Sequence, residues 1–179
     1  FITAMRPGVA NRIEAEVRDH ASDAAVTFEQ TRQLTFARNV FRETLRLYPP
    51  ITFLPRVALK PVRFGRYQLR RGSMVMIAPW VVQRHKGLWR NPQAFDPDRF
   101  LPEREREITP GSYIPFGIGR RVCVGAAFAT TEATLILARL LRRYRFIVER
   151  PERVRPVARL TTRPAEEIMV RIRRVDGVS

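Results

Sequence analysis

The only cysteine of this chain, Cys123, lies in a short segment whose residue types and spacing could bind a metal cofactor. Arg121 stands two positions before it, and Gly119 and Gly125 flank it on both sides. A thiolate is the axial haem ligand that pushes electron density towards O–O cleavage. Arginine is always charged, and its planar fork suits a carboxylate such as a haem propionate. These four residues therefore predict an axial-ligand loop for an oxygen-activating haem.

The elements around Cys123 are predicted to stabilise its ionised form. Residues 126–142 contain no proline and predict a helix that begins beside the sulfur. The unpaired N–H groups and the positive dipole end of a helix N-terminus favour an anion, and the thiolate is the form that binds a metal. Gly119 and Gly125 suit a chain that turns sharply and lies close to a flat cofactor, and Phe116 is placed to exclude water from the sulfur.

The alternative for a lone cysteine is a small buried hydrophobic residue. The spacing argues against this alternative. At ordinary amino-acid usage, a match to five fixed positions in a chain of this length arises by chance with a probability on the order of 10⁻⁴ or less. Those positions form the pattern Phe-x-x-Gly-x-Arg-x-Cys-x-Gly over residues 116–125.

This pattern resembles the haem-binding loop of the cytochrome P450 superfamily, the haem-thiolate monooxygenases. The similarity extends over residues 7–173, nearly the whole chain. Three further stretches agree with family motifs in content and order. They are Glu43-Thr44-Leu45-Arg46, similar to the Glu-x-x-Arg helix motif; Leu47-Tyr48-Pro49-Pro50 followed by Arg56, similar to the turn into the first sheet; and residues 95–100, similar to the Pro-Glu-Arg-Phe segment, with Asp98 in place of the usual glutamate.

The resemblance implies a mainly α-helical fold with small antiparallel β-sheets (α+β), of which this chain is the proximal, C-terminal portion. We expect one unit over residues 1–179. Near its end, apolar and polar residues alternate over 168–173 and predict a strand with one solvent-exposed face. The expected elements, in order, are a helix over 7–19, the Glu-x-x-Arg helix over about 30–48, a β region over 57–77, a meandering loop over 92–112, the haem loop over 114–125, a helix over 126–142 and a β region over 146–174.

The resemblance also implies that the cofactor is haem b and that Cys123 is the axial ligand of its iron. Gln83 stands where many family members have a histidine that contacts a propionate, and its amide can still donate a hydrogen bond. The two histidines, His20 and His85, have no spacing that supports a metal site with the cysteine. The remaining residues expected to contact the haem are Arg56, Pro115, Phe116, Gly117, Arg121, Val124, Gly125 and Ala129.

Glu43 and Arg46 are three residues apart, so they project from neighbouring positions on one side of a helix. Taken alone, such a pair is typical of a solvent-exposed ion pair. Beside the other motifs, we expect a buried network with Arg99 that fixes the loop holding Cys123. Removal of one partner would then leave an unpaired buried charge, at a cost of about 3–5 kcal/mol.

The resemblance places two apolar or mildly polar turns beside the haem, where they would line a substrate pocket. Ile51, Phe53 and Leu54 belong to the first turn, and Leu160 and Thr161 belong to the second. We therefore expect a small hydrophobic substrate. Plain core packing is the alternative for these residues.

The family's long central helix has no counterpart in this sequence. In the family that helix carries the acid–alcohol pair that delivers protons to bound oxygen, so we expect no catalytic pair of that kind in this chain. We expect the missing N-terminal half of the same protein to be a partner, and the chain alone to be inactive. A peroxygenase or isomerase on the same scaffold is one alternative function, and a non-catalytic basic binding module or degenerate remnant is another.

The net charge of +16 comes almost entirely from arginine, since Lys60 and Lys86 are the only lysines. The basic residues are scattered without a known nucleic-acid motif, so we expect no nucleic acid as a partner. A solvated, arginine-rich surface is one interpretation. The other is a basic proximal face that docks a ferredoxin- or flavin-type electron donor. The candidates for that face are Arg120, Arg142, Arg143 and Arg145.

The sequence also gives an expectation for the cellular compartment of the protein. No run of 18 or more apolar residues occurs, so no membrane-spanning segment is expected in this chain. A single cysteine cannot form an internal disulfide, and we expect no signal peptide before the fold. These features favour the reducing cytoplasm.

Overall fold

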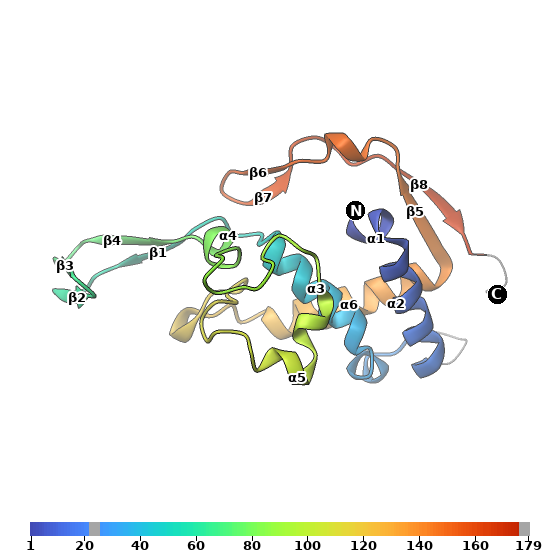
Figure 1. The fold of residues 1–179 in the computed structure, drawn as a ribbon, viewed down its shortest axis with the longest axis horizontal. Helices are drawn as coiled ribbons and strands as arrows, with labels where there is room; N and C mark the ends of the chain where they lie inside the picture. Colours follow the sequence, from blue (N-terminus) through green and yellow to red (C-terminus); the bar gives the residue numbers. More distant parts are fainter. Residues whose placement is uncertain (22–25, 176–179) are drawn as a thin grey trace.

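The computed structural model describes residues 1–21 and 26–175. Its centre consists of the helices α2 (Pro7–His20), α3 (Thr35–Leu47) and α6 (Ala126–Arg143), which pack against one another (Figure 1). Each helix repeats apolar residues at intervals of three and four, so each presents one apolar side to the others. The buried members of this core include Ala10, Ile13 and Val17 from α2, Phe36, Ala37 and Val40 from α3, and Ala138 and Leu141 from α6.

Helix α3 begins later than the sequence predicts. Residues Glu29–Arg32 form a separate 3₁₀ helix, η1, and α3 starts only at Thr35. A carboxylate from α2 fixes this start, because Glu16 accepts hydrogen bonds from the backbone N–H groups of Phe36 at 2.6 Å and Ala37 at 2.9 Å. The first N–H groups of a helix have no acceptor within the helix itself, so Glu16 supplies one from outside.

A β-arm follows α3 and extends away from the helices (Figure 1). Strand β1 (Leu54–Val57) pairs antiparallel with β4 (Met74–Ile77), and β2 (Val62–Phe64) pairs antiparallel with β3 (Tyr67–Leu69). The arm is antiparallel as predicted, but it begins at Leu54, before the expected region of 57–77.

The chain then returns to the helices through short elements. Helix α4 (Pro79–Val82) leads into the meander, where η2 (Pro97–Phe100) and the short helix α5 (Pro102–Glu105) occupy part of the segment expected to be a loop. The 3₁₀ helix η3 (Gly119–Arg121) lies inside the cysteine loop. The other short helix, α1 (Ile2–Met5), precedes α2, which has Pro7 in its first turn.

The last part of the chain forms two antiparallel strand pairs. Strand β5 (Tyr144–Val148) pairs with β8 (Val170–Arg174), and β6 (Pro156–Ala158) pairs with β7 (Thr162–Pro164) after the 3₁₀ helix η4 (Pro151–Arg153). The prediction of one buried face on the last strand is wrong. All five residues of β8 are exposed, because β8 lies on the outside of the fold beside β5 (Figure 1). Among the described residues, no helix is both long and apolar enough to cross a membrane.

Candidate haem-binding site

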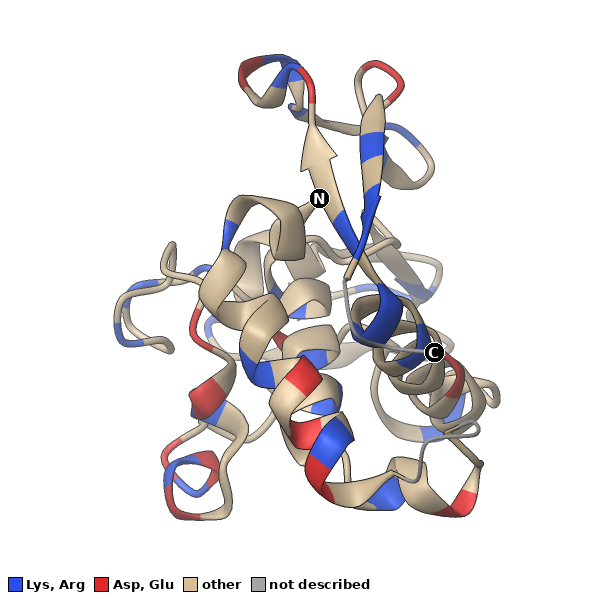
Figure 2. Ribbon diagram, turned by 90° about the vertical axis from the view of Figure 1, so that its right-hand side faces the viewer, with Lys and Arg blue, Asp and Glu red and all other residues tan. Residues whose placement is uncertain are grey.

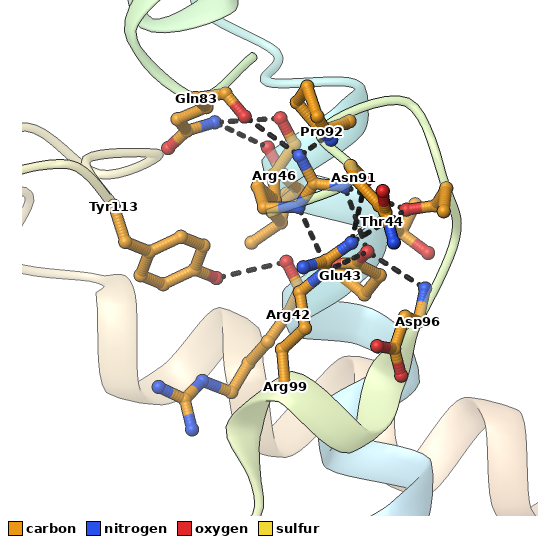
Figure 3. A network of polar contacts seen from close by, with 12 residues as sticks. Arg42, Glu43, Thr44, Arg46, Gln83, Asn91, Pro92, Asp96, Arg99 and Tyr113 are labelled. Atoms are coloured by element: carbon orange, nitrogen blue, oxygen red, sulfur yellow. Dashed lines mark hydrogen bonds and ion pairs between the residues drawn. The ribbon is translucent and has the colours of Figure 1, made fainter. Parts of the chain in front are cut away.

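A buried ionic network lies beside α3 and is centred on Glu43 (Figure 3). Glu43 and Arg46 are fully buried, and Arg99 of η2 is 6% exposed. Arg46 donates from Nε to Oε2 of Glu43 at 2.7 Å and from Nη2 to Oε1 at 2.9 Å, a two-point contact that fixes both groups. Oε1 also accepts from Arg99 Nε at 3.3 Å and from the backbone N–H of Asp96 at 2.9 Å. The structure therefore brings together the three residues expected in this network and excludes a solvent-exposed pair.

The two guanidinium groups also hold the irregular chain that leads towards the cysteine loop. Arg46 donates from Nη1 to the carbonyls of Gln83 and Pro92 at 2.8 Å each. Arg99 donates to the carbonyl of Arg90 at 2.6 Å. Buried carbonyls outside helices and strands need such partners. The ionic network therefore supplies hydrogen-bond donors to carbonyls that backbone N–H groups would satisfy in a helix or sheet.

Two further ion pairs fix the same region, and no sequence motif indicated them. Arg12 of α2 contacts Asp98 of η2, and Arg104 of α5 contacts Asp96, both at 2.8 Å. Burial acts to raise the pKa of Asp96. The hydrogen bond and charge of Arg104, the charge of Arg99 and a backbone hydrogen bond from Asp98 together outweigh burial, so the pKa lies below its ordinary value. Arg12 and Asp98 are 86 positions apart, so only tertiary structure could reveal that pair.

Gln83 does not have the role that the resemblance implies. Its side chain is fully buried. Its amide nitrogen donates to the carbonyls of Leu45 and Arg46 at 3.0 Å each, and its amide oxygen accepts from the backbone N–H of Ile114 at 2.8 Å. Both amide hydrogens are used within the protein. The prediction that Gln83 binds a haem propionate is therefore wrong.

The cysteine loop lies at the surface. Cys123 is exposed, which excludes the alternative of a small buried hydrophobic residue. Its backbone N–H donates to the carbonyl of Phe116 at 2.9 Å and so closes the loop. Gly117 and Gly119 have φ values of 81° and 71°, in the left-handed region that favours glycine. Gly125 also lies in a turn, directly before α6, and its φ of −84° is one that any residue can adopt.

The sulfur of Cys123 lies beside the start of α6. A Cβ placed on Gly125, the residue directly before that helix, would be 3.8 Å from Sγ. Helix α6 has 18 residues, so its aligned peptide dipoles give its N-terminus a substantial partial positive charge. The structure thus places the sulfur beside the N-terminus of the helix, as the sequence predicts.

Apolar side chains around this thiol are left uncovered. Phe128 in the first turn of α6 is 71% exposed, and Val124 projects fully into solvent. Ile118 and Val122 are each about half exposed. Arg121 is exposed beside them. An exposed thiol, with exposed apolar side chains and an exposed arginine at neighbouring positions of the chain, fits a flat apolar cofactor that carries carboxylates.

The other residues expected at the haem lie on three elements. Arg56 is half-buried in β1, where its Nη1 donates to the carbonyl of Pro55 at 2.8 Å. Pro115 is buried in the cysteine loop. Of the remaining residues, Phe116, Gly117 and Gly125 lie in the cysteine loop and Ala129 lies in α6, and all four are half-buried.

The two turns expected to line a substrate pocket lie side by side, although they are far apart in the sequence. Ile51 forms an antiparallel β-bridge with Thr161. Phe53 and Leu160 are exposed and Leu54 is half-buried, so core packing within this chain does not explain them. A cavity of about 190 Å³ beside Phe53 is further lined by Thr52, Ala78, Trp80, Val81, Pro156 and Ala158.

The four arginines expected to form a docking face are spread along α6 and the segments at its two ends. Arg120 precedes the start of α6, whereas Arg142 and Arg143 lie in its last turn. A helix of 18 residues is about 27 Å long. Arg145 forms an ion pair with Glu14 of α2. Figure 2 shows basic residues spread over helices, strands and loops. The docking face built from these four residues stays a prediction.

The fold and the cysteine loop define a class of haem protein. The model of the cytochrome P450 family matches residues 2–172, and the chain belongs to this family. The heme domain in the "Crystal structure of cytochrome P450DA heme domain" matches with a TM-score of 0.89 and 31% identity, over 97% of this chain and 38% of that chain. The predicted class of helices with small antiparallel sheets is therefore confirmed.

Two similar proteins of the family come from Streptomyces species. The chain is 39% identical to cyclooctatin synthase of Streptomyces melanosporofaciens, over 94% of this chain and 37% of the relative. It is 31% identical to pentalenene oxygenase of Streptomyces avermitilis, over 96% of this chain and 38% of the relative. The chain thus spans less than two-fifths of the length of these relatives.

Proposed function

We propose that the protein is a haem-thiolate monooxygenase that inserts one oxygen atom of O₂ into a hydrophobic organic substrate. Membership of the cytochrome P450 family supports this function. The observation that carries the proposal is the exposed thiol of Cys123 among uncovered apolar side chains, with Arg121 beside it. A cysteine with a purely structural role would be buried.

In this proposal Cys123 binds the iron of haem b as a thiolate, and the N-terminus of α6 stabilises its charge. Arg121 and Arg56 bind the propionates through charge-assisted hydrogen bonds. Val124 and Phe128 would pack on the cofactor, and Phe116 would exclude water from the sulfur. When bound, haem supplies the oxygen-activating chemistry, and thiolate ligation favours O–O cleavage.

The proposed substrate is a small hydrophobic molecule that contacts the two adjoining turns. Ile51, Phe53 and Leu54 would contact it from one turn, and Leu160 and Thr161 from the other. The exposed apolar side chains of Ile51, Phe53 and Leu160 support this choice, since burial of apolar surface is the main source of affinity for such ligands.

We also propose that further parts of the haem domain complete the site. A second cavity, of about 450 Å³, lies between α1, α3, α6 and the β6–β7 pair. Its lining is mainly apolar and includes Val40, Phe41, Ile136, Leu137 and Ile168. The relatives have additional chain beyond the part matched here. A segment of that kind would fill the cavity and supply the acid–alcohol pair that this chain lacks.

The proposed electron donor is a ferredoxin- or flavin-type protein. The net charge of +16 favours association with an acidic partner, and such association weakens as salt screens the charges. We place the protein in the cytoplasm, where a reducing environment keeps a single exposed thiol free.

The test is the spectrum of the full-length gene product that contains this sequence. After reduction and treatment with carbon monoxide, the haem protein should show the strongly red-shifted band of thiolate ligation. Cys123→Ser should abolish that band, whereas Leu59→Ser, at an exposed position on the β-arm, should leave it unchanged. Absence of bound haem in the wild-type protein would support the non-catalytic binding module instead. Turnover with peroxide but not with O₂ and a reductant would support a peroxygenase.

A further inference from the structure

Gln83 lies at a junction between the end of α3 and the beginning of the cysteine loop (Figure 3). The carbonyl groups of Leu45 and Arg46 in the last turn of α3 lack the backbone donors that a continuing helix would supply. In a continuing helix, the N–H of residue 49 would bind the carbonyl of Leu45, and the N–H of residue 50 would bind the carbonyl of Arg46. Both positions are prolines, Pro49 and Pro50, which have no N–H. Two carbonyls beside the ionic network are thus left without backbone donors.

The side chain of Gln83 supplies the two missing donors. Its single amide nitrogen carries two hydrogens and lies 3.0 Å from each of the carbonyl oxygens of Leu45 and Arg46. In the opposite direction, the backbone carbonyl of Gln83 accepts from the guanidinium of Arg46 at 2.8 Å. Gln83 is therefore attached to the last turn of α3 by both its side chain and its backbone.

The third contact of the amide connects this junction to the cysteine loop. The Oε1 atom of Gln83 accepts from the backbone N–H of Ile114 at 2.8 Å. Ile114 is buried and opens the loop. Its own carbonyl accepts from the N–H of Gly117 at 3.1 Å, and the carbonyl of Phe116 accepts from the N–H of Cys123 at 2.9 Å. A short series of hydrogen bonds thus leads from α3 to the cysteine.

We propose that Gln83 is a positioning residue that transmits the placement of the Glu43–Arg46 helix turn to the Cys123 loop. The inference rests on the proposed function, because the purpose of that placement is to present the thiolate to the haem iron. A glutamine suits this task better than most side chains. It offers two donors and an acceptor from one neutral planar group, whereas a neutral imidazole offers one donor and one acceptor.

The first test measures the loop itself and does not depend on haem. In the full-length gene product without haem, we compare backbone hydrogen exchange of Gln83→Met with that of the wild type. We expect exchange over residues 110–123 to become about tenfold faster, since one buried hydrogen bond is lost at Ile114. Gln68→Met is the matched control, because Gln68 is exposed on β3. It should leave exchange in the loop unchanged.

The second test measures ligation. In the haem-loaded protein, Gln83→Met should convert a substantial fraction of the reduced, carbon-monoxide-bound form from the thiolate band to a band at shorter wavelength. The haem need not be lost for this change to occur. Gln68→Met should retain the wild-type spectrum. Wild-type exchange and a wild-type spectrum in Gln83→Met would together overturn the proposal.

A milder variant covers the case in which Gln83→Met does not fold. Gln83→His retains one donor and one acceptor, so we expect it to fold. Relative to the wild type, hydrogen exchange should accelerate more in residues 110–123 than in α6. Equal acceleration in both segments would overturn the proposal, because it would indicate general destabilisation. Failure of the proposed function is distinguishable: the wild-type protein would then lack the thiolate band, while Gln83→Met would still loosen the loop.

Discussion

Replacement of Glu43 by alanine should destabilise the protein far more than any ordinary ion-pair deletion. The Glu43 carboxylate accepts four hydrogen bonds: two from Arg46, one from Arg99 and one from the backbone of Asp96. In Glu43→Ala both guanidinium groups stay buried without their counter-charge. Hydrogen bonds to charged groups contribute about 1.5–3 kcal/mol each, but bonds that share one acceptor group are not additive. The expected loss of unfolding free energy is therefore about 3–5 kcal/mol.

This loss is a large fraction of the total stability of an ordinary domain, which is about 5–15 kcal/mol. We expect Glu43→Ala to yield protein without bound haem rather than a slow enzyme, because the network holds the segments that lead to the cysteine loop. The measurements are the denaturant midpoint of the full-length gene product and its haem content per chain.

Glu29 provides a matched control for Glu43. It also pairs with an arginine three residues later, Arg32, at 3.7 Å, but both side chains are more than 70% exposed. Glu29→Ala should change the unfolding free energy by no more than about 1 kcal/mol. A Glu43→Ala protein that kept full haem content and unfolded within about 1 kcal/mol of the Glu29→Ala variant would refute the reasoning.

Three further predictions concern residues around the same helices. Glu16→Ala should lower the unfolding free energy by about 1–2 kcal/mol, since it removes the cap of α3, while exposed Glu132→Ala should not. Burial raises the pKa of Tyr113, so the folded state keeps a proton that the unfolded chain loses; stability should fall as the pH rises above about 10, and Tyr113→Phe should flatten that fall. The pKa of Asp96 is lowered, so its contribution is present above about pH 4 and lost on acidification; Arg104→Gln should reduce that loss in acid-unfolding curves.

Local motifs made much of the site predictable. The pattern around Cys123 indicates both a ligand and the helix behind it, because a thiolate, its neighbouring arginine and a helix N-terminus are close in sequence. The Glu43–Arg46 spacing places two charges on one helix side. Spacing alone favoured solvent exposure, and only the motif on residues 95–100 indicated that Arg99 joins them in a buried network.

Other features could not be predicted because their partners are distant in the sequence. Glu16 sets the start of α3 from another helix, so a periodic pattern placed that start too early. Gln83 occupies a position associated with cofactor contact, yet its three hydrogen bonds join backbone segments that lie 31 and 37 or 38 residues away.

The amino-acid sequence by itself determined the family, the pattern of residues around Cys123 and the order of the helices, because these depend on residue types a few positions apart. Tertiary structure decided which polar groups are satisfied within the protein and which stay exposed. Hydrogen bonds within the fold satisfy the side chains of Arg46, Arg99 and Gln83. In contrast, Cys123 and Arg121 are exposed. The physical reason is that burial removes water as a partner, so each buried donor must find an acceptor that only folding brings near.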